Sequence, residues 1–251
     1  AQFFAPSWFQ AVKLALAPRG QLFMCADPNQ GFMKNRLSWR SVGLEVAGRT
    51  KKLRRSYRST RCILQAATAV LRMLAQGDPD DYLEPDFTGM DEGRRPQLLY
   101  ADSPRDARQR LLNELAALTG EHGVPLDAFL VIYGRNVDKG ALYEGLWRRF
   151  GADRVWWFNE QSQKKAPPAR HGGACLRMAN LDTATGLEAG IVILVGMEPL
   201  LDFGPRSDER APEREEGLRK LYMAMTRAGQ RLVLLSCRPL PPDVERLFEQ
   251  P

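Results

Sequence analysis

Three short polar stretches of this chain carry side chains that could contact a phosphate group. They span residues 27–30, 57–59 and 185–188. A guanidinium group donates paired hydrogen bonds to phosphate oxygens, and a glutamine amide can orient a phosphate or a water molecule. These residue types predict a phosphorylated ligand in one cleft. The candidate side chains in them are Gln30, Tyr57, Arg58, Gly186 and Glu188.

The chain has no sequence of the form GxxxxGK[ST], the loop that wraps the phosphates in most nucleotide hydrolases, and it also lacks GxSxG and HExxH. It cannot be a complete enzyme of the phosphate-loop class. We therefore expect another domain to supply the rest of the phosphate-binding groups.

Arg227 is a further candidate because of its position on a predicted helix. The apolar stripe of that helix consists of Leu218, Leu221, Tyr222 and Met225. Arg227 lies nine positions beyond Leu218, which places Arg227 on the opposite face at the helix end, near Gly229. The geometry of the helix favours the interpretation that Arg227 is a cation at the helix C-terminus that complements the helix dipole. Phosphate binding by Arg227 is the alternative.

The net charge of +6 is unevenly distributed. Residues 34–61 contain ten basic side chains and one acidic one, Glu45, and Trp39 lies among them. A charge run of this kind is usually a solvated face. Because Trp39 lies within it, contact with nucleic acid is an equal alternative.

The pattern of apolar runs predicts the elements that hold these residues. Short apolar runs are separated by segments of helical periodicity, as in an α/β domain with a mainly parallel sheet. Ligands of such sheets bind outside the carboxyl ends of the strands, so we expect the chemistry there. A short helix is expected over residues 12–16, and strands are expected over residues 21–26, 98–100, 129–133, 155–158, 191–195 and 232–235.

Composition excludes other classes. Four scattered cysteines and two histidines, without a CxxC pair, indicate neither a zinc site nor a disulfide framework, so no metal site is expected within the chain. No apolar run approaches the ~18 residues of a membrane span, and no signal segment opens the chain. We expect a soluble, cytoplasmic protein.

Four segments, taken in order, resemble helicase motifs. Each is short, but the fourth matches over eight residues and the order is that of UvrD/Rep-like superfamily 1 DNA helicases, which this chain resembles over about its whole length. The segments are Ala26-Asp27-Pro28-Asn29-Gln30 (motif III, GDxxQ), Ser56-Tyr57-Arg58-Ser59 (motif IV, YRS), Thr185-Gly186-Leu187-Glu188 (motif V, KGLE) and Leu221-Tyr222-Met223-Ala224-Met225-Thr226-Arg227-Ala228 (motif VI, LYVAMTRA).

This resemblance implies a RecA-like fold and a domain division. Residues 1–48 would be the tail of a first RecA-like domain, and residues 49–251 a second one. Ala1-Gln2 is similar to the end of the DExQ Walker B motif, so the Walker A loop and most Mg²⁺ ligands would lie upstream of this chain. The partners implied are ATP, the upstream RecA-like domain, and single-stranded or tailed duplex DNA.

The resemblance also implies a role for each matching residue. Gln30 would sense the γ-phosphate or the attacking water, and Arg58 and Arg227 would be arginine fingers. Glu188 would hold the ribose, with Tyr57 and Gly186 beside the nucleotide. The DNA contacts would come from Trp39, from Arg135 and Asn136 in a segment similar to LYRxN, and from motif V residues Asn180 and Asp182.

This chain departs from the family pattern in several places. Trp39 follows Gln30 by nine positions where five are usual, and Asn180, Asp182 and Thr185 stand where Thr, His and Lys are usual. Exchanging cations for a carboxylate should weaken contact with the DNA backbone. Only 121 residues separate Arg58 from Asn180, too few for the large inserted subdomain of UvrD.

Three functions remain open from the sequence. The first is the C-terminal motor half of an ATP-dependent 3′–5′ DNA helicase serving DNA repair or replication. The second is a non-hydrolysing nucleic-acid-binding or partner-docking domain that kept the fold. The third is an unrelated α/β domain that binds a small molecule.

Overall fold

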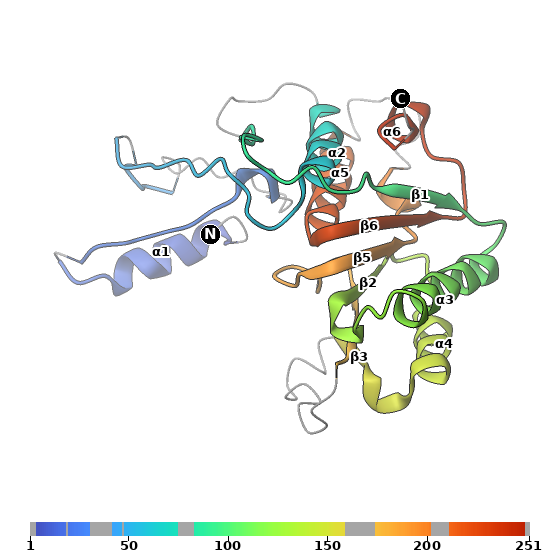
Figure 1. Ribbon diagram of the computed structural model, residues 1–251. Helices are drawn as coiled ribbons and strands as arrows, with labels where there is room; N and C mark the ends of the chain where they lie inside the picture. The colour runs from blue at the N-terminus through green and yellow to red at the C-terminus, as the bar shows by residue number, and fades with distance from the viewer. Residues whose placement is uncertain are drawn as a thin grey trace.

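The computed structural model describes residues 4–18, 20–30, 42–46, 48–74, 83–158, 174–201 and 211–248. Its centre is one sheet of six parallel strands in the order β1-β6-β5-β2-β4-β3 (Figure 1). This confirms the predicted parallel α/β fold class. The strands are β1 (Gln97–Tyr100), β2 (Phe129–Tyr133), β3 (Val155–Phe158), β4 (Leu176–Asn180), β5 (Ala189–Val195) and β6 (Ala228–Ser236).

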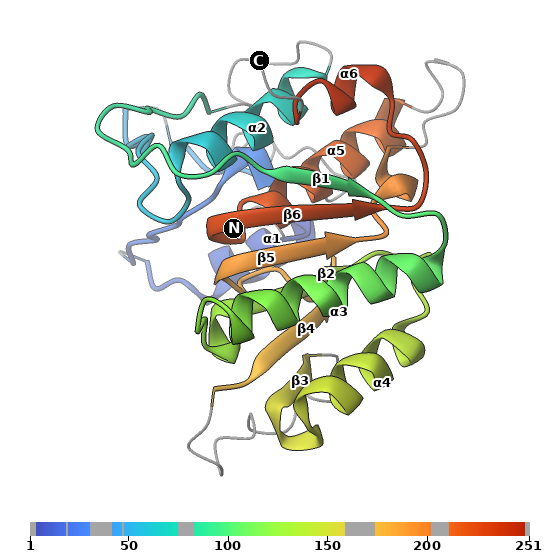
Figure 2. The same cartoon turned by 45° about the vertical axis from the view of Figure 1, so that its right-hand side comes forward.

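Helices cover both faces of this sheet (Figure 2). Helices α2 (Arg61–Arg72) and α5 (Ala211–Met225) pack on one face, and α3 (Pro104–Gly120) and α4 (Lys139–Phe150) pack on the other. The described residues also form two shorter helices, α1 (Pro6–Ala15) and α6 (Pro242–Glu245). In Figure 1, α1 lies apart from the sheet.

The alternation of side chains along each strand divides the core into two halves. In β2, Leu130 and Ile132 face α2 and α5, whereas Phe129 and Val131 face α3 and α4. All five residues of β2 are buried. Because a strand covered on both faces must be apolar throughout, its sequence reads as a continuous apolar run.

Helices α3 and α4 begin at residues whose side chains accept a hydrogen bond from a backbone N–H group of the first turn. Ser103 and Asp138 accept hydrogen bonds from the backbone of Asp106 and Ala141, at 3.1 and 3.0 Å, at the starts of α3 and α4. At the start of α2 the N–H groups of residues 61 and 62 instead donate to carbonyl groups of residues 91 and 92. The segment after α2 therefore returns to the beginning of that helix.

Three elements differ from the sequence-based expectation. Residues 21–26 are not a buried strand: they lie outside the sheet, and Phe23 is 90% exposed. The helix expected over residues 12–16 is α1, which begins at Pro6. Strand β4 was missed because Arg177 and Asn180 interrupt its apolar pattern; Leu176, Met178 and Ala179 are buried, whereas Arg177 and Asn180 are partly exposed.

The connection between β4 and β5 crosses one face of the sheet without a helix. Since both strands are parallel, residues 181–188 must return from the carboxyl end of β4 to the amino end of β5. Leu181 and Ala184 are buried in the same core as α2 and α5. We call residues 181–188 the crossing segment; they reach both ends of the sheet.

Among the described residues, no helix is long and apolar enough to cross a membrane. The four cysteines are all described, and none of them forms a disulfide.

The close packing of α5 gives a stability prediction. A Cβ atom at Gly217, inside α5, would lie 2.3 Å from the backbone oxygen of Leu200, whereas a Cβ at Gly120, at the end of α3, would meet nothing within 4 Å. Alanine is favoured over glycine in a helix by up to ~1 kcal/mol. Gly217→Ala should therefore lower the thermal midpoint of unfolding despite this gain, while the matched variant Gly120→Ala should hold or raise it.

Candidate functional site

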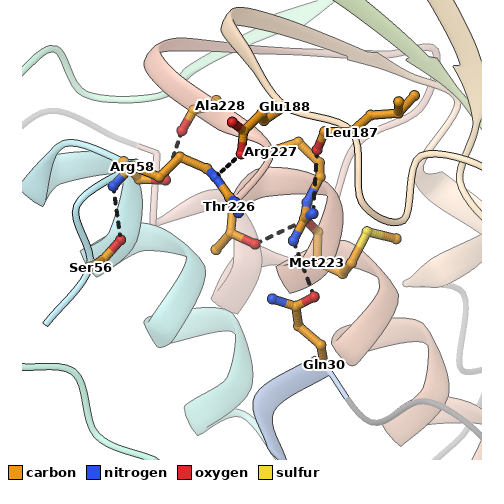
Figure 3. A network of polar contacts seen from close by, with 10 residues as sticks. Gln30, Ser56, Arg58, Leu187, Glu188, Met223, Thr226, Arg227 and Ala228 are labelled. Carbon is orange, nitrogen blue, oxygen red and sulfur yellow. Dashed lines mark hydrogen bonds and ion pairs between the residues drawn. The ribbon is translucent and has the colours of Figure 1, made fainter. Parts of the chain in front are cut away.

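Four residues from separate parts of the chain meet at the amino ends of β5 and β6. Arg227 donates a hydrogen bond to Gln30, and Arg58 forms an ion pair with Glu188 (Figure 3). The two pairs are close enough for the charge of Arg58 to act on Arg227. We call these four residues the arginine cluster. Each comes from a different one of the four motif-like segments, so the structure brings together what the sequence holds up to 197 positions apart.

Arg227 is at the centre of the cluster and is 4% exposed. Its guanidinium group donates to the backbone oxygens of Met223 and Leu187, at 3.0 and 3.3 Å, and to Oε1 of Gln30 at 3.1 Å. Burial, and next the charge of Arg58, lower the pKa of Arg227. The sequence places Arg227 on the face opposite the apolar stripe of α5. The side chain is nevertheless buried in the structure, because Gln30 and the crossing segment enclose the end of α5.

Arg58 and Glu188 form the accessible part of the cluster. Their side chains, 46% and 57% exposed, are joined by an ion pair between Nε of Arg58 and a carboxylate oxygen of Glu188. The backbone around Arg58 is fixed on β6, since Ser59 Oγ donates to the oxygen of Ala228 at 2.7 Å. The cluster thus presents one guanidinium group to solvent and holds the other below the surface.

Asp27 sets the orientation of the Gln30 amide. Its carboxylate accepts a hydrogen bond of 2.7 Å from Gln30 Nε2 and another of 3.0 Å from the backbone N–H of Asn29. With Nε2 directed at Asp27, Oε1 of Gln30 is left to face Arg227. Burial raises the pKa of Asp27, although these hydrogen bonds and the charge of Arg227 oppose the shift.

Asn29 fastens this segment to the rest of the domain. Its buried amide exchanges two hydrogen bonds, both of 2.9 Å, with the backbone of Leu83, and lies 3.5 Å from the hydroxyl group of Tyr222 on α5. Burial and the nearby Asp27 carboxylate raise the pKa of Tyr222 to about 12. Sequence reasoning gave no separate role to Asp27 and Asn29, whose long-range partners have no signature in the sequence.

Tyr57 and Gly186 border the cluster. Tyr57 is 89% exposed, which leaves its ring free to contact a ligand. Gly186 is exposed and has a φ of 86°, so its backbone conformation, not lack of space, favours glycine there. Both flank the exposed pair of Arg58 and Glu188 in sequence.

The cluster does not lie where the fold class alone predicts. Arg227 directly precedes β6, and Glu188 directly precedes β5, so these side chains are at the amino ends of the strands. The cluster therefore lies at the opposite edge of the sheet from the carboxyl ends, where ligands of such sheets are expected. The cause is the crossing segment and α5, which both end at the amino edge of the sheet.

The carboxyl ends of the central strands hold a second polar network. It is built on Glu198, a carboxylate only 8% exposed that follows β5. Glu198 accepts hydrogen bonds from Asn136 Nδ2 at 3.1 Å, Ser236 Oγ at 3.1 Å and the backbone N–H of Cys237 at 2.5 Å. Glu198 has no signature in the sequence. Asn136, which the resemblance assigns to a DNA contact, donates a hydrogen bond from its amide to Glu198.

The remaining nucleic-acid candidates that are described differ in their surroundings. Arg135 is beside Asn136, and its side chain is 80% exposed and pairs with Asp182. The side chain of Asn180 accepts a hydrogen bond of 2.7 Å from the backbone N–H of Thr183, within the same turn. Trp39 lies outside the described residues.

Acidic residues line part of the basic segment. Glu92 pairs with Arg61 at 3.5 Å, whereas Glu84 pairs with Arg72, which lies on α2 outside this segment. A backbone bridge joins Arg55 to Asp86, whose pKa is lowered by hydrogen bonds from Thr88 and by nearby arginines. Residues 83–92 therefore neutralise part of the basic charge of residues 49–61.

Among the described residues, no group of three or more His, Cys, Asp or Glu side chains could hold a metal ion. Glu188 is the carboxylate of the arginine cluster, and it pairs with Arg58. The donor set of the cluster thus suits an anionic ligand better than a cation.

Comparisons with known proteins found similarity among solved structures. No family model matches the chain, and no curated protein matches it. Among solved structures, the chain is similar to the C-terminal domain of a possible DNA helicase from Lactobacillus plantarum WCFS1, with 21% identity and a TM-score of 0.49. The match covers 76% of this chain and 94% of that one.

The raised pKa of Asp27 predicts a pH-dependent stability. A carboxyl whose pKa is higher in the folded state stabilises the fold below its unfolded pKa, and this contribution is lost as pH rises through the folded pKa. The free energy of unfolding of the wild type minus that of Asp27→Asn should therefore fall as the pH rises above about 4, the ordinary pKa of an aspartate.

The matched variant is Asp86→Asn. The pKa of Asp86 is lowered. The free energy of unfolding of the wild type minus that of Asp86→Asn should therefore rise as the pH increases through the acid range. Denaturant titrations at several pH values measure both differences. A difference for Asp27→Asn that does not change with pH would show that Asp27 has an ordinary pKa.

Proposed function

We propose that this chain is the second RecA-like motor half of an ATP-dependent DNA helicase or translocase, resembling the UvrD/Rep class and moving 3′ to 5′. The observation that carries the proposal is the arginine cluster. Four motif-like segments, predicted separately, converge on one site, and random short matches have no reason to meet in space.

In this proposal the triphosphate of ATP lies against the cluster, between this chain and a first RecA-like domain that carries the phosphate loop and most Mg²⁺ ligands. Arg58 and Arg227 would meet the γ-phosphate, where planar guanidinium groups stabilise the charge of the transition state. Gln30, held by Asp27, would orient the phosphate or the attacking water. Tyr57, Gly186 and Glu188 would border the base and ribose.

Two contacts must change when the nucleotide binds. The γ-phosphate would have to replace Glu188 on Arg58, and would have to share Arg227 with Gln30. A carboxylate and an amide are easily replaced by a more highly charged phosphate, since charge-assisted hydrogen bonds to guanidinium groups are the stronger ones. The unliganded cluster would thereby keep both guanidinium groups paired until ATP arrives.

The alternative is a non-hydrolysing nucleic-acid-binding or partner-docking domain derived from a helicase. The observation in its favour is that Arg135, the expected backbone contact, pairs with Asp182, where the family has histidine. The first proposal predicts ATP hydrolysis, and neither form of the alternative does, so hydrolysis distinguishes them.

The decisive measurement is ATP turnover by the longer protein that includes the upstream phosphate loop. We expect Arg58→Ala to lower DNA-stimulated turnover by ~10³-fold or more while DNA affinity changes little. Arg227→Lys, which keeps the charge of a buried side chain but loses the planar fork, should also lower turnover severely. Arg105→Ala, an exposed arginine on α3, is the control.

Normal turnover in the Arg58 variant would assign Arg58 a structural role. The 251-residue chain alone should bind ATP weakly and hydrolyse none. Robust turnover by it would contradict the proposed division of the site.

The proposed DNA contact is tested by salt dependence. If Arg135 neutralises one backbone phosphate, Arg135→Ala should reduce the slope of log affinity against log salt by ~0.7 for single-stranded DNA, equally for all sequences. Arg148→Ala on α4 removes the same charge elsewhere and should leave the slope unchanged. An equal slope for wild type and Arg135→Ala would exclude the contact.

A further inference from the structure

The crossing segment connects the two polar sites through consecutive contacts. At its end nearest β4, Asp182 pairs with Arg135 beyond β2 and with Lys220 on α5. At its other end, Leu187 accepts from Arg227, and Glu188 pairs with Arg58. One stretch of eight residues therefore touches both the proposed DNA contact and the arginine cluster.

The two partners of Asp182 are held very differently. Lys220 Nζ lies 3.0 Å from Asp182 Oδ1 and 2.9 Å from Glu216, and its side chain is 9% exposed. Arg135 Nη2 lies 3.8 Å from Asp182 Oδ2, and its side chain is 80% exposed. A buried ammonium group between two carboxylates is costly to separate from them, whereas an exposed pair at 3.8 Å contributes little.

Of the two ion pairs of Asp182, only the one with Arg135 is therefore weak enough for another anion to replace it. An external phosphate can take the place of the Asp182 carboxylate on Arg135, because Asp182 keeps its bond to Lys220 when Arg135 leaves. The carboxylate remains in position and continues to compete for Arg135. Glu198 meanwhile holds the adjacent Asn136, so the loop that carries Arg135 stays in place.

We propose that Asp182 is an internal counter-ion of Arg135 that competes with the nucleic-acid backbone and so lowers the affinity of this chain for single-stranded DNA. The inference rests on the proposed function, because it takes Arg135 as a phosphate contact. It adds that Asp182 is a residue that limits this contact and makes none of its own. Asp182, counted above among the DNA-binding candidates, thus acts against binding.

The test compares single-stranded DNA binding by the 251-residue chain and its Asp182→Asn variant, using labelled oligothymidylate over a range of salt concentrations. The asparagine keeps an oxygen for Lys220, and Glu216 still neutralises that ammonium group. We expect Asp182→Asn to bind about two- to fivefold more tightly at low salt, as the loss of a competing surface pair predicts, and less so at high salt. Since one phosphate contact contributes ~0.7 to the slope in total, the slope against log salt should become steeper only by the part of this amount that the competition suppresses in the wild type.

Two further variants identify the mechanism. In an Arg135→Ala background, Asp182→Asn should bring no gain, because the group for which it competes is absent. Glu216→Gln removes a negative charge from the same lysine but does not pair with Arg135, so it should not tighten binding. An equal gain in either experiment would show general repulsion of DNA by negative charge and would overturn the proposal. Thermal unfolding of each variant verifies that the fold is retained.

The outcomes separate this inference from the proposed function. If Arg135→Ala weakens binding and lowers the slope while Asp182→Asn equals the wild type, the DNA contact stands and the competition is refuted. If Arg135→Ala changes nothing, the contact and the competition both fail. Binding by Asp182→Asn but not by the wild type would support the competition in its strongest form, and binding by neither would overturn it.

Discussion

The buried guanidinium group of Arg227 is the constraint on which the organisation of this site depends. A buried cation must have hydrogen-bond acceptors on all sides, because leaving its donors unsatisfied costs more than a single hydrogen bond gains. Arg227 finds them in Met223 of its own helix, Leu187 of the crossing segment and Gln30 of the N-terminal region. Satisfying one side chain therefore fixes three chain segments against one another.

The surrounding polar residues follow from this requirement. Gln30 can accept a hydrogen bond from Arg227 because the N–H group of the Gln30 amide is directed at Asp27. Asp27 is itself buried, and this burial raises the pKa of its carboxyl group. The charge of Arg58 helps to lower the pKa of Arg227, and Glu188 partly neutralises that charge. The cluster is a balanced set of charges that an anionic ligand would rearrange.

A parallel sheet separates the two polar sites, and the crossing segment joins them. β5 has seven residues, which at ~3.3 Å each place its two ends about 20 Å apart. The crossing segment spans this distance because β4 and β5 run in the same direction. A change at Asp182 and a change at Glu188 thus act on a single short stretch of backbone, packed on α5 through Leu181 and Ala184.

The sequence alone determined the fold class and the identity of the residues that meet. Five of the six strands coincide with apolar runs, since a strand buried on both faces must be apolar, and the motif-like segments supplied Gln30, Arg58, Glu188 and Arg227. Only the tertiary structure decided how these residues are paired. The burial of Arg227, the hold of Asp27 on Gln30, the network around Glu198 and the bond between Asp182 and Lys220 join residues from 3 to 197 positions apart. Such contacts depend on which strand ends and helix ends come together in space, and hydrophobic periodicity carries no information about that.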